Sequence, residues 1–252
     1  DGDQGGAGRS YILFGTDDAL PQEFRLADMT GSDGTKLSGE STGDQSGSTL
    51  SCAGDVNGDG FDDVVIGAPN ADSNGSDSGS SYLVFGSSRL PATLELADLD
   101  GENGFRMDGE NSNDHSGYAV AGAGDVNGDG FDDVVIGAPD ANPGDGRTGR
   151  IYVVFGRESF SSTIDLARLD GRDGFKLDGE NFGDDAGISV GAAGDITGDG
   201  RADLAIGAQG ADVDGNTDAG RSYVIYGRGA PDEGVSVEDE VVLFVDSFEP
   251  ES

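Results

Sequence analysis

The sequence predicts an all-β fold built from a repeated sheet of four antiparallel strands. Three observations lead to this prediction. One nine-residue motif recurs at a constant interval along the chain, at 55–63, 125–133 and 195–203. Short β-branched and aromatic runs bounded by glycine recur with it, and such runs are typical of strands. The chain of 252 residues also contains 46 glycines and only 7% aromatic residues, a composition that favours many tight turns between short strands.

Each repeat contains four strand-like segments in a fixed order. In the second complete copy they are residues 117–123 before the motif, 134–139 after it, 149–156, and 174–180 beyond a longer connection. The run after the motif is continuously apolar, which is typical of a strand covered on both faces. Four short strands per repeat, stacked between similar neighbours, predict the blades of a β-propeller. A solenoid is the alternative, although its repeats are usually shorter.

The constant interval between the motifs also predicts the domain boundaries. We expect residues 1–46 to form a partial blade with its third and fourth strands, and 47–116 and 117–186 to form complete blades. Residues 187–227 form a blade without a regular fourth strand. Residues 228–252 form an acidic C-terminal segment with one apolar run at 241–245, which is either a replacement fourth strand or a strand for another molecule.

The recurring motif has the chemistry of a calcium-binding loop. Oxygen-bearing side chains lie at its positions 1, 3, 5 and 9, and a glycine at position 6 permits a tight reversal. Calcium takes six to eight oxygen ligands, and the backbone carbonyl at position 7 adds another. The candidate metal-binding residues are Asp55, Asn57, Asp59, Phe61 and Asp63, then Asp125, Asn127, Asp129, Phe131 and Asp133, and then Asp195, Thr197, Asp199, Arg201 and Asp203.

Charge and composition exclude several classes of function. The chain has 50 acidic and 14 basic residues, for a net charge of −36, which argues against nucleic acid and anionic lipid as partners. No apolar run approaches the roughly 18 residues of a membrane span, and the first residues do not resemble a signal peptide. Cys52 is the single cysteine, so no disulfide within the chain is available, and we expect it to be a small buried residue beside the motif.

Together these segments resemble the FG-GAP repeat of integrin α-subunit propellers and of bacterial surface proteins. The resemblance is carried by residues 116–120, 122–139 and 152–156 and their counterparts, and it covers residues 1 to about 227. The long connection is more similar to the bacterial branch. The resemblance implies part of a seven-bladed propeller, secreted or at the cell surface, with Ca²⁺ at about three sites, one in each hairpin loop. It also implies that the third loop, with Thr197 in place of asparagine, binds calcium more weakly.

Competing interpretations of individual residues are less well supported. An EF-hand needs a glutamate at loop position 12, where these loops have Ile66, Ile136 and Ile206. A second acidic loop, clearest at 212–218, has alternating oxygens that could also hold calcium or simply be solvated. His115 beside Asp114 could belong to a Ser-His-Asp triad, but no nucleophile motif accompanies it, and a polar turn is the simpler interpretation.

We therefore expect a non-catalytic extracellular calcium-binding module for adhesion or protein–protein interaction, with a protein or surface-glycan ligand. The alternative is a structural protein that self-assembles into a ring or filament, because the repeats present amount to about half of a seven-bladed ring. Either further blades lie upstream, or copies assemble through incomplete terminal blades and exchange strands. The propeller arm of a secreted enzyme is the third hypothesis.

Overall fold

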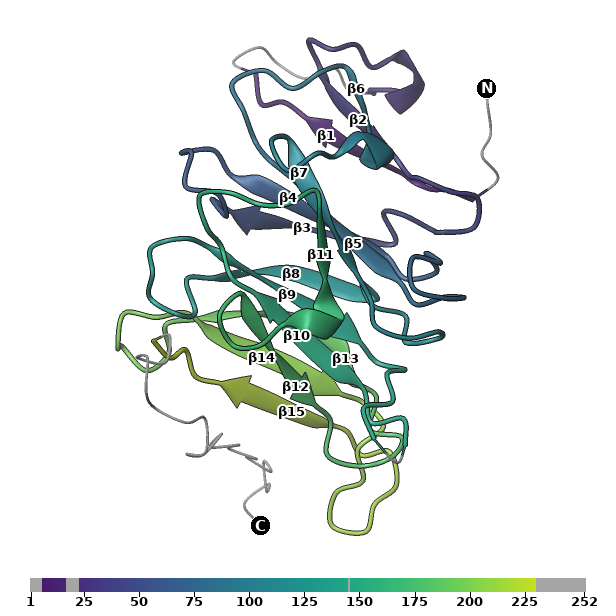
Figure 1. Cartoon of the computed structure of the whole chain (residues 1–252), viewed down its shortest axis with the longest axis vertical. Helices are drawn as coiled ribbons and strands as arrows, with labels where there is room; N and C mark the ends of the chain where they lie inside the picture. Colours follow the sequence, from purple (N-terminus) through teal and green to yellow (C-terminus); the bar gives the residue numbers. More distant parts are fainter. Residues whose placement is uncertain (1–5, 17–22, 145, 230–252) are drawn as a thin grey trace.

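The computed structural model describes residues 6–16, 23–144 and 146–229, which form a stack of four small β-sheets (Figure 1). The apolar run at 241–245 lies outside these residues. The first sheet contains β1 (Arg9–Leu13), β2 (Gly34–Ser38) and β6 (Thr93–Glu95). The second contains β3 (Thr49–Gly54), β4 (Asp63–Ala68), β5 (Ser80–Val84) and β7 (Gly104–Asp108), with β11 (Thr163–Asp165) at its edge. The third contains β8 (Ala119–Gly124), β9 (Asp133–Ala138), β10 (Arg150–Val154) and β12 (Gly174–Asp178), and the fourth contains β13 (Ala186–Gly194), β14 (Asp203–Ala208) and β15 (Arg221–Ile225).

Within the second and third sheets, four consecutive strands of one repeat pair antiparallel in sequence order. This arrangement confirms the predicted all-β fold of propeller-type blades. The apolar strand β4 contributes to two different cores, because successive side chains point to opposite faces of a strand. Val65 packs in the core shared with the third sheet, whereas Ile66 packs in the core shared with the first sheet. The continuous apolar run at 64–66 is therefore explained by burial on both faces.

The long connections contain structure that the sequence analysis missed. Each begins with an extended segment and continues into one turn of 3₁₀ helix, at Leu96–Asp98 (η2) and Leu166–Arg168 (η3), while η1 occupies Leu26–Asp28. The extended segments β6 and β11 pair parallel with β2 and β7, the last strands of the preceding sheets. Each connection therefore ties its own sheet to the sheet before it.

Glycines allow adjacent sheets to approach closely. A Cβ atom at Gly137 of β9 would overlap the backbone carbonyl oxygen of Gly187 in the fourth sheet. A Cβ atom at Gly67 of β4 would likewise overlap the backbone carbonyl oxygen of Gly117, just before β8 of the third sheet. At Gly207 of β14, by contrast, an added Cβ would overlap only the hydroxyl of Ser189, which can rotate away.

We expect Gly137→Ala to lower the free energy of unfolding by about 1–3 kcal/mol, the usual cost of forcing extra volume into a packed interior. Gly207→Ala is the matched control and should change stability much less, since its obstacle is a movable side chain. Urea denaturation of the two variants measures the difference. Equal losses would mean that the close contact between the third and fourth sheets is not rigid.

Candidate metal-binding loops

The three motif loops lie side by side along one edge of the stack, between the first two strands of their sheets (Figure 1). Direct backbone contacts join neighbouring loops. Asp132 donates its N–H to the Asp55 carbonyl (3.2 Å), and its carboxylate accepts from the Asp55 N–H (2.9 Å). Ala202 donates to the Asp125 carbonyl in the same way (2.9 Å). Asp132, which was not among the predicted site residues, therefore links the first and second loops.

Within each loop the first aspartate organises the turn. The Asp125 carboxylate accepts hydrogen bonds from the backbone N–H groups of Gly128 (2.6 Å), Asp129 (3.1 Å) and Gly130 (2.9 Å). Gly130 has a φ of 94°, a conformation that side chains with a Cβ rarely adopt. Asp195 makes the same three bonds in the third loop. The expected tight reversal is thus present, and it is held by the same carboxylate that was predicted as a ligand.

The last aspartate of each loop is completely buried and has a second role. Asp133 is 0% exposed and accepts hydrogen bonds from the N–H groups of Val126 (2.9 Å) and Gly156 (2.9 Å). Asp63 binds Val56 and Gly86, and Asp203 binds Ile196 and Gly227, at distances of 2.8–2.9 Å. This carboxylate therefore fastens its loop to the chain that follows the third strand. In the sequence, this contact is indicated by the glycine that recurs after the third strand, at Gly86, Gly156 and Gly227.

Burial and neighbouring charge raise the pKa values of two of these carboxylates, Asp63 and Asp133. Loss of solvent raises the pKa of Asp133 to about 7, against the two backbone hydrogen bonds that lower it, and the nearby charges of Asp129 and Asp125 raise it further. The pKa of Asp63 is raised to about 6 for the same reasons, with Asp59 and Asp55 as the charged neighbours. A cation in the loop would offset both the lost hydration and the mutual repulsion.

The donor set fits a hard cation. Each loop offers three carboxylates and one neutral side-chain oxygen, and a carboxylate oxygen that accepts one N–H bond, such as Asp125 Oδ2, keeps a second lone pair. In the described part of the chain, no three acidic, histidine or cysteine side chains converge as a ready-made metal cluster. The loop oxygens are turned toward backbone donors, as in Asp129, which accepts from Phe131 (2.9 Å). The predicted residues of a loop therefore lie together in one turn, with their oxygens engaged by that turn.

The third loop differs from the first two in its second oxygen. Asn57 and Asn127 each donate to the aspartate two residues on, at 3.0 and 2.8 Å. Thr197 instead bonds back to Asp195 at 3.4 Å. Asp199 thus lacks the contact with an asparagine that its counterparts have, and its side chain lies 3.7 Å from the Arg201 guanidinium instead. The weaker calcium binding expected for this loop stays a prediction.

The other residues noted in the sequence have simpler surroundings. His115 Nδ1 lies 2.7 Å from Asp140 Oδ2, and Arg147 contacts the same carboxylate at 2.9 Å. Ser116, the adjacent hydroxyl, is 0% exposed, so this group does not present an accessible nucleophile. The expectation that Cys52 is buried is wrong: its side chain is exposed, on the same face of β3 as the exposed Leu50.

The second acidic loops are organised as turns. Asp72 accepts from the N–H of Asp77 (2.8 Å), and Asp212 accepts from the N–H of Asp218 (2.9 Å). Asp140, the corresponding residue of the second loop, pairs with His115 and Arg147 instead. The three loops therefore do not share one arrangement of oxygens.

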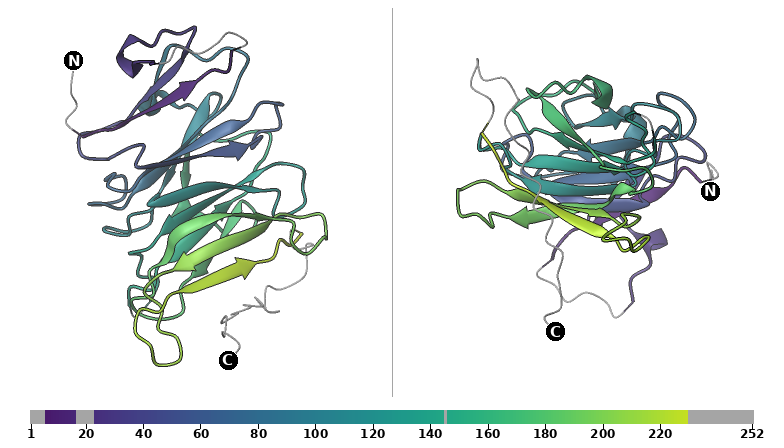
Figure 2. Two further views of the ribbon diagram at one scale, coloured as in Figure 1. Left: turned by 180° about the vertical axis from the view of Figure 1, so that it is seen from behind. Right: turned by 90° about the horizontal axis from the view of Figure 1, so that it is seen from below.

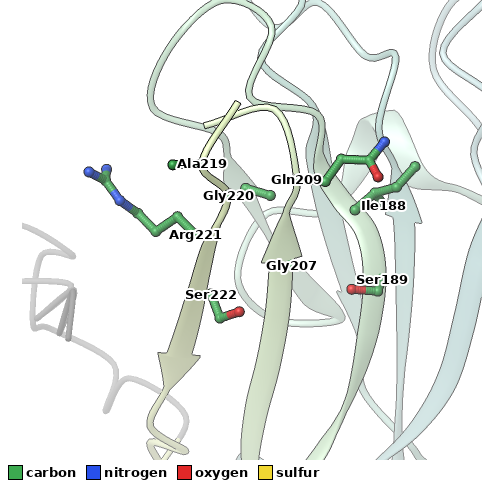
Figure 3. Close-up of a pocket in the computed structure, with 9 residues that line it drawn as sticks. Ile188, Ser189, Gly207, Gln209, Ala219, Gly220, Arg221 and Ser222 are labelled. Carbon is green, nitrogen blue, oxygen red and sulfur yellow. The ribbon is translucent and has the colours of Figure 1, made fainter. Parts of the chain in front are cut away.

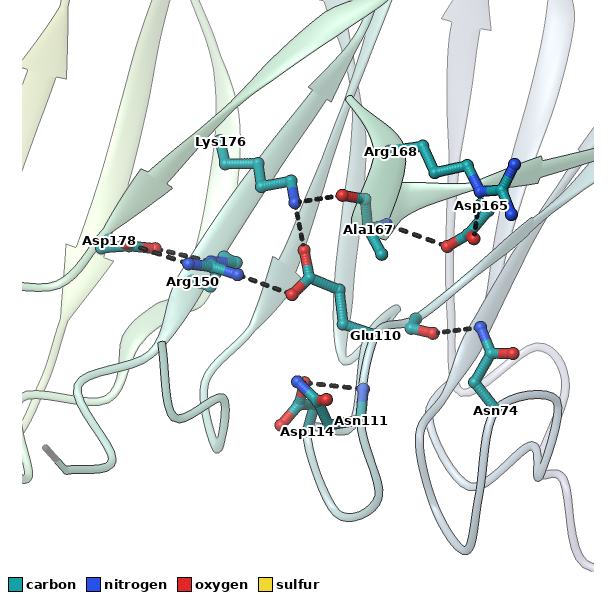
Figure 4. A network of polar contacts seen from close by, with 11 residues as sticks. Asn74, Glu110, Asn111, Asp114, Arg150, Asp165, Ala167, Arg168, Lys176 and Asp178 are labelled. Carbon is teal, nitrogen blue, oxygen red and sulfur yellow. Dashed lines mark hydrogen bonds and ion pairs between the residues drawn. The ribbon is translucent and has the colours of Figure 1, made fainter. Parts of the chain in front are cut away.

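A charged network between sheets was not predicted (Figure 4). Glu110 follows β7 of the second sheet and accepts hydrogen bonds from Arg150 (2.7 Å) and Lys176 of the third sheet. Arg150 also binds Asp178 of β12. Glu40 contacts Arg106 in the same way (3.0 Å), and Glu180 contacts Arg221. The equal spacing of these glutamates is a signal in the sequence, but their partners lie 40–66 residues away.

A cavity of about 610 Å³ opens on the fourth sheet (Figure 3). It is lined by Ser189, Gly207, Gln209, Arg221 and Ser222, among others. Gly207 is the counterpart of Gly67 and Gly137, and each of these two glycines lies against the backbone of the following repeat. The cavity thus lies where a further sheet would pack.

Comparison with known proteins identifies the repeats. Residues 48–84, 116–154 and 186–225 match the FG-GAP repeat. The chain is 33% identical over 178 residues to integrin alpha-PS5 of Drosophila melanogaster, an alignment that covers 69% of this chain and 16% of that protein. It is 30% identical to integrin alpha pat-2 of Caenorhabditis elegans (61% of this chain, 12% of that protein) and to integrin alpha-V of Gallus gallus (63% and 14%).

The aligned part of the chain spans between 11 and 16% of the length of these integrin relatives. None of the helices in residues 6–16, 23–144 and 146–229 is long and apolar enough to cross a membrane. The matched integrins are much longer proteins, and this chain corresponds to a small part of each.

Proposed function

Because the chain is a member of the FG-GAP repeat proteins, we propose that it is a non-catalytic, extracellular, calcium-binding module for adhesion or protein interaction. The observation that carries this proposal is the recurrence of one carboxylate-lined loop in three consecutive sheets. The candidate ligands are those predicted from the sequence, with the carbonyls of Phe61, Phe131 and Arg201 completing each set. We also propose the blade boundaries 1–46, 47–116, 117–186 and 187–227, within a seven-bladed arrangement.

Calcium in these loops would be a structural element rather than a reactant. It would neutralise carboxylates that lie close together and fix the edge of each sheet, where neighbouring loops already contact one another through Asp132 and Asp55. A surface fixed in this way is suited to binding a protein or glycan ligand, because little conformational entropy is lost on association. The similarity to integrin α subunits supports the interaction role.

Isothermal titration calorimetry of chelator-treated protein tests the proposal directly. We expect about three calcium ions per chain for the wild type, and one fewer for Asp129→Ala, which removes an exposed carboxylate of the second loop. Asp62→Ala is the matched control, because it removes the same charge from a motif loop at a position whose side chain forms no hydrogen bond or ion pair with the described residues. Equal stoichiometry in the two variants would show that the ligand assignment is wrong.

A second candidate function is self-assembly of a structural protein. It is favoured by the two ends of the stack that the described residues leave uncovered, namely the cavity beside Gly207 and the exposed outer side of the first sheet. In this case copies of the chain would join end to end through incomplete blades, and the calcium loops would stiffen the assembly. Heterologous contacts of this kind produce rings or filaments.

A further inference from the structure

The outer side of the first sheet matches two surfaces that are buried elsewhere in the stack. We define this first-sheet face by Arg9, Tyr11, Leu13, Leu26 and Lys36. Leu13 is 54% exposed and Leu26 is 45% exposed. Their counterparts in the second and third repeats are Val84 and Val154, each 1% exposed, and Leu96 and Leu166, at 2% and 0%. The first-sheet face therefore has the composition of an interface between sheets but is not covered by the described residues.

The basic residues of the first-sheet face also match those of the internal interfaces. Arg9 occupies the strand position of Arg150 and Arg221, and Lys36 occupies that of Arg106 and Lys176. In the internal interfaces these cations form ion pairs with a glutamate that follows the last strand of the preceding sheet. Glu40 pairs with Arg106 in this way, and Glu110 pairs with Arg150 and Lys176. Arg9 and Lys36 form no ion pair or side-chain hydrogen bond with any residue that the structure describes. The face thus presents two basic groups at positions that elsewhere bind a carboxylate.

We propose that the first-sheet face binds the acidic C-terminal segment, residues 230–252, of a second copy of this chain. This segment has eight acidic residues and no basic residue, so its charge complements Arg9 and Lys36. The glutamates at 40, 110 and 180 are equally spaced, and one further interval leads to position 250, which is flanked by Glu249 and Glu251. The apolar run at 241–245 precedes these glutamates, as Leu37 precedes Glu40, and would cover Leu13 and Leu26.

The arrangement of the stack favours a second copy over the segment of the same chain. The first and fourth sheets lie at opposite ends of the stack (Figure 2), so the described part of one chain does not bring its last sheet against its first. A few outer strands are sufficient to form a buried contact between two sheets. The first sheet packs on the second through β1, β2 and β6 alone, and this contact buries Leu37 and Tyr82. The inference rests on the self-assembly candidate above and assigns its interface.

Sedimentation velocity of the full chain over a range of concentrations tests the interface with two charge-reversal variants. Arg9→Glu with Lys36→Glu alters the face, and Glu249→Lys with Glu251→Lys alters the segment. We expect the wild type to associate as concentration rises, and each variant alone to associate at least about tenfold more weakly, the scale of losing paired interfacial charges. An equimolar mixture of the two variants should recover association. The unaltered segment of the first variant can bind the unaltered face of the second, and the reversed charges of the other pair again complement each other.

Arg168→Glu with Arg172→Glu is the matched control, since it reverses two exposed cations away from the face and should associate like the wild type. A wild type that stays monomeric at all concentrations overturns the proposal, as does association of the two test variants equal to that of the wild type. Calcium stoichiometry measured on the same samples keeps this result separate from the calcium proposal. Failure of association with three ions bound would reject the interface alone.

Discussion

Replacing Asp133 with alanine is expected to lower the free energy of unfolding by about 2–4 kcal/mol, even with calcium removed. The carboxylate is 0% exposed and accepts hydrogen bonds from Val126 and Gly156. A buried donor left without an acceptor costs about 1–3 kcal/mol, and the substitution leaves two. The gain from no longer burying a carboxylate, whose pKa is raised by lost hydration, offsets part of the loss.

Asp129→Ala is the matched control for this experiment, because Asp129 belongs to the same loop but is exposed. Urea denaturation in excess EDTA should show a large loss for Asp133→Ala and a small one for Asp129→Ala. With calcium present, both variants should fall below the wild type. Equal losses in EDTA would mean that the hydrogen bonds of Asp133 with Val126 and Gly156 do not stabilise the metal-free protein.

The architecture was largely predictable because its signals are local and repeated. The constant interval between motifs, the glycine-bounded runs and the apolar segment at 134–138 correctly predict the four antiparallel strands of a repeat. The parallel strands β6 and β11 were missed. Each is only three residues long, and each is stabilised by pairing with a different repeat, so neither has a pattern of its own.

The candidate site was predictable in part, for a related physical reason. The motif places the loop residues correctly between the first two strands, and the tight reversal at Gly130 follows from its sequence. The anchoring role of Asp133 depends on Gly156, 23 residues away, and the ion pair of Glu110 depends on Arg150, 40 residues away. Such contacts are set by how the sheets stack. The burial of Cys52 was predicted wrongly because its small counterparts, Gly122 and Ala192, do not reveal which face the residue occupies.

Removal of calcium is expected to destabilise the whole stack. A site filled at tenfold over its dissociation constant adds about 1.4 kcal/mol, so three independent sites would add roughly 4 kcal/mol. For a chain of this length that corresponds to roughly 8–16 °C in the melting temperature. The loss should spread beyond one sheet, since the loops contact each other through Asp132 and Asp55.

Differential scanning calorimetry in calcium and in excess EDTA measures this effect, and elemental analysis of the purified protein gives its metal content. Magnesium is the control ion: it requires near-ideal octahedral geometry and gives up its waters reluctantly, so it should restore less stability than calcium. Thr197→Asn should raise the calcium-dependent increment, because it supplies the third loop with the side chain that orients Asp59 and Asp129 in the other loops. An unchanged transition in EDTA, with no metal found in the protein, would contradict the calcium assignment for all three loops.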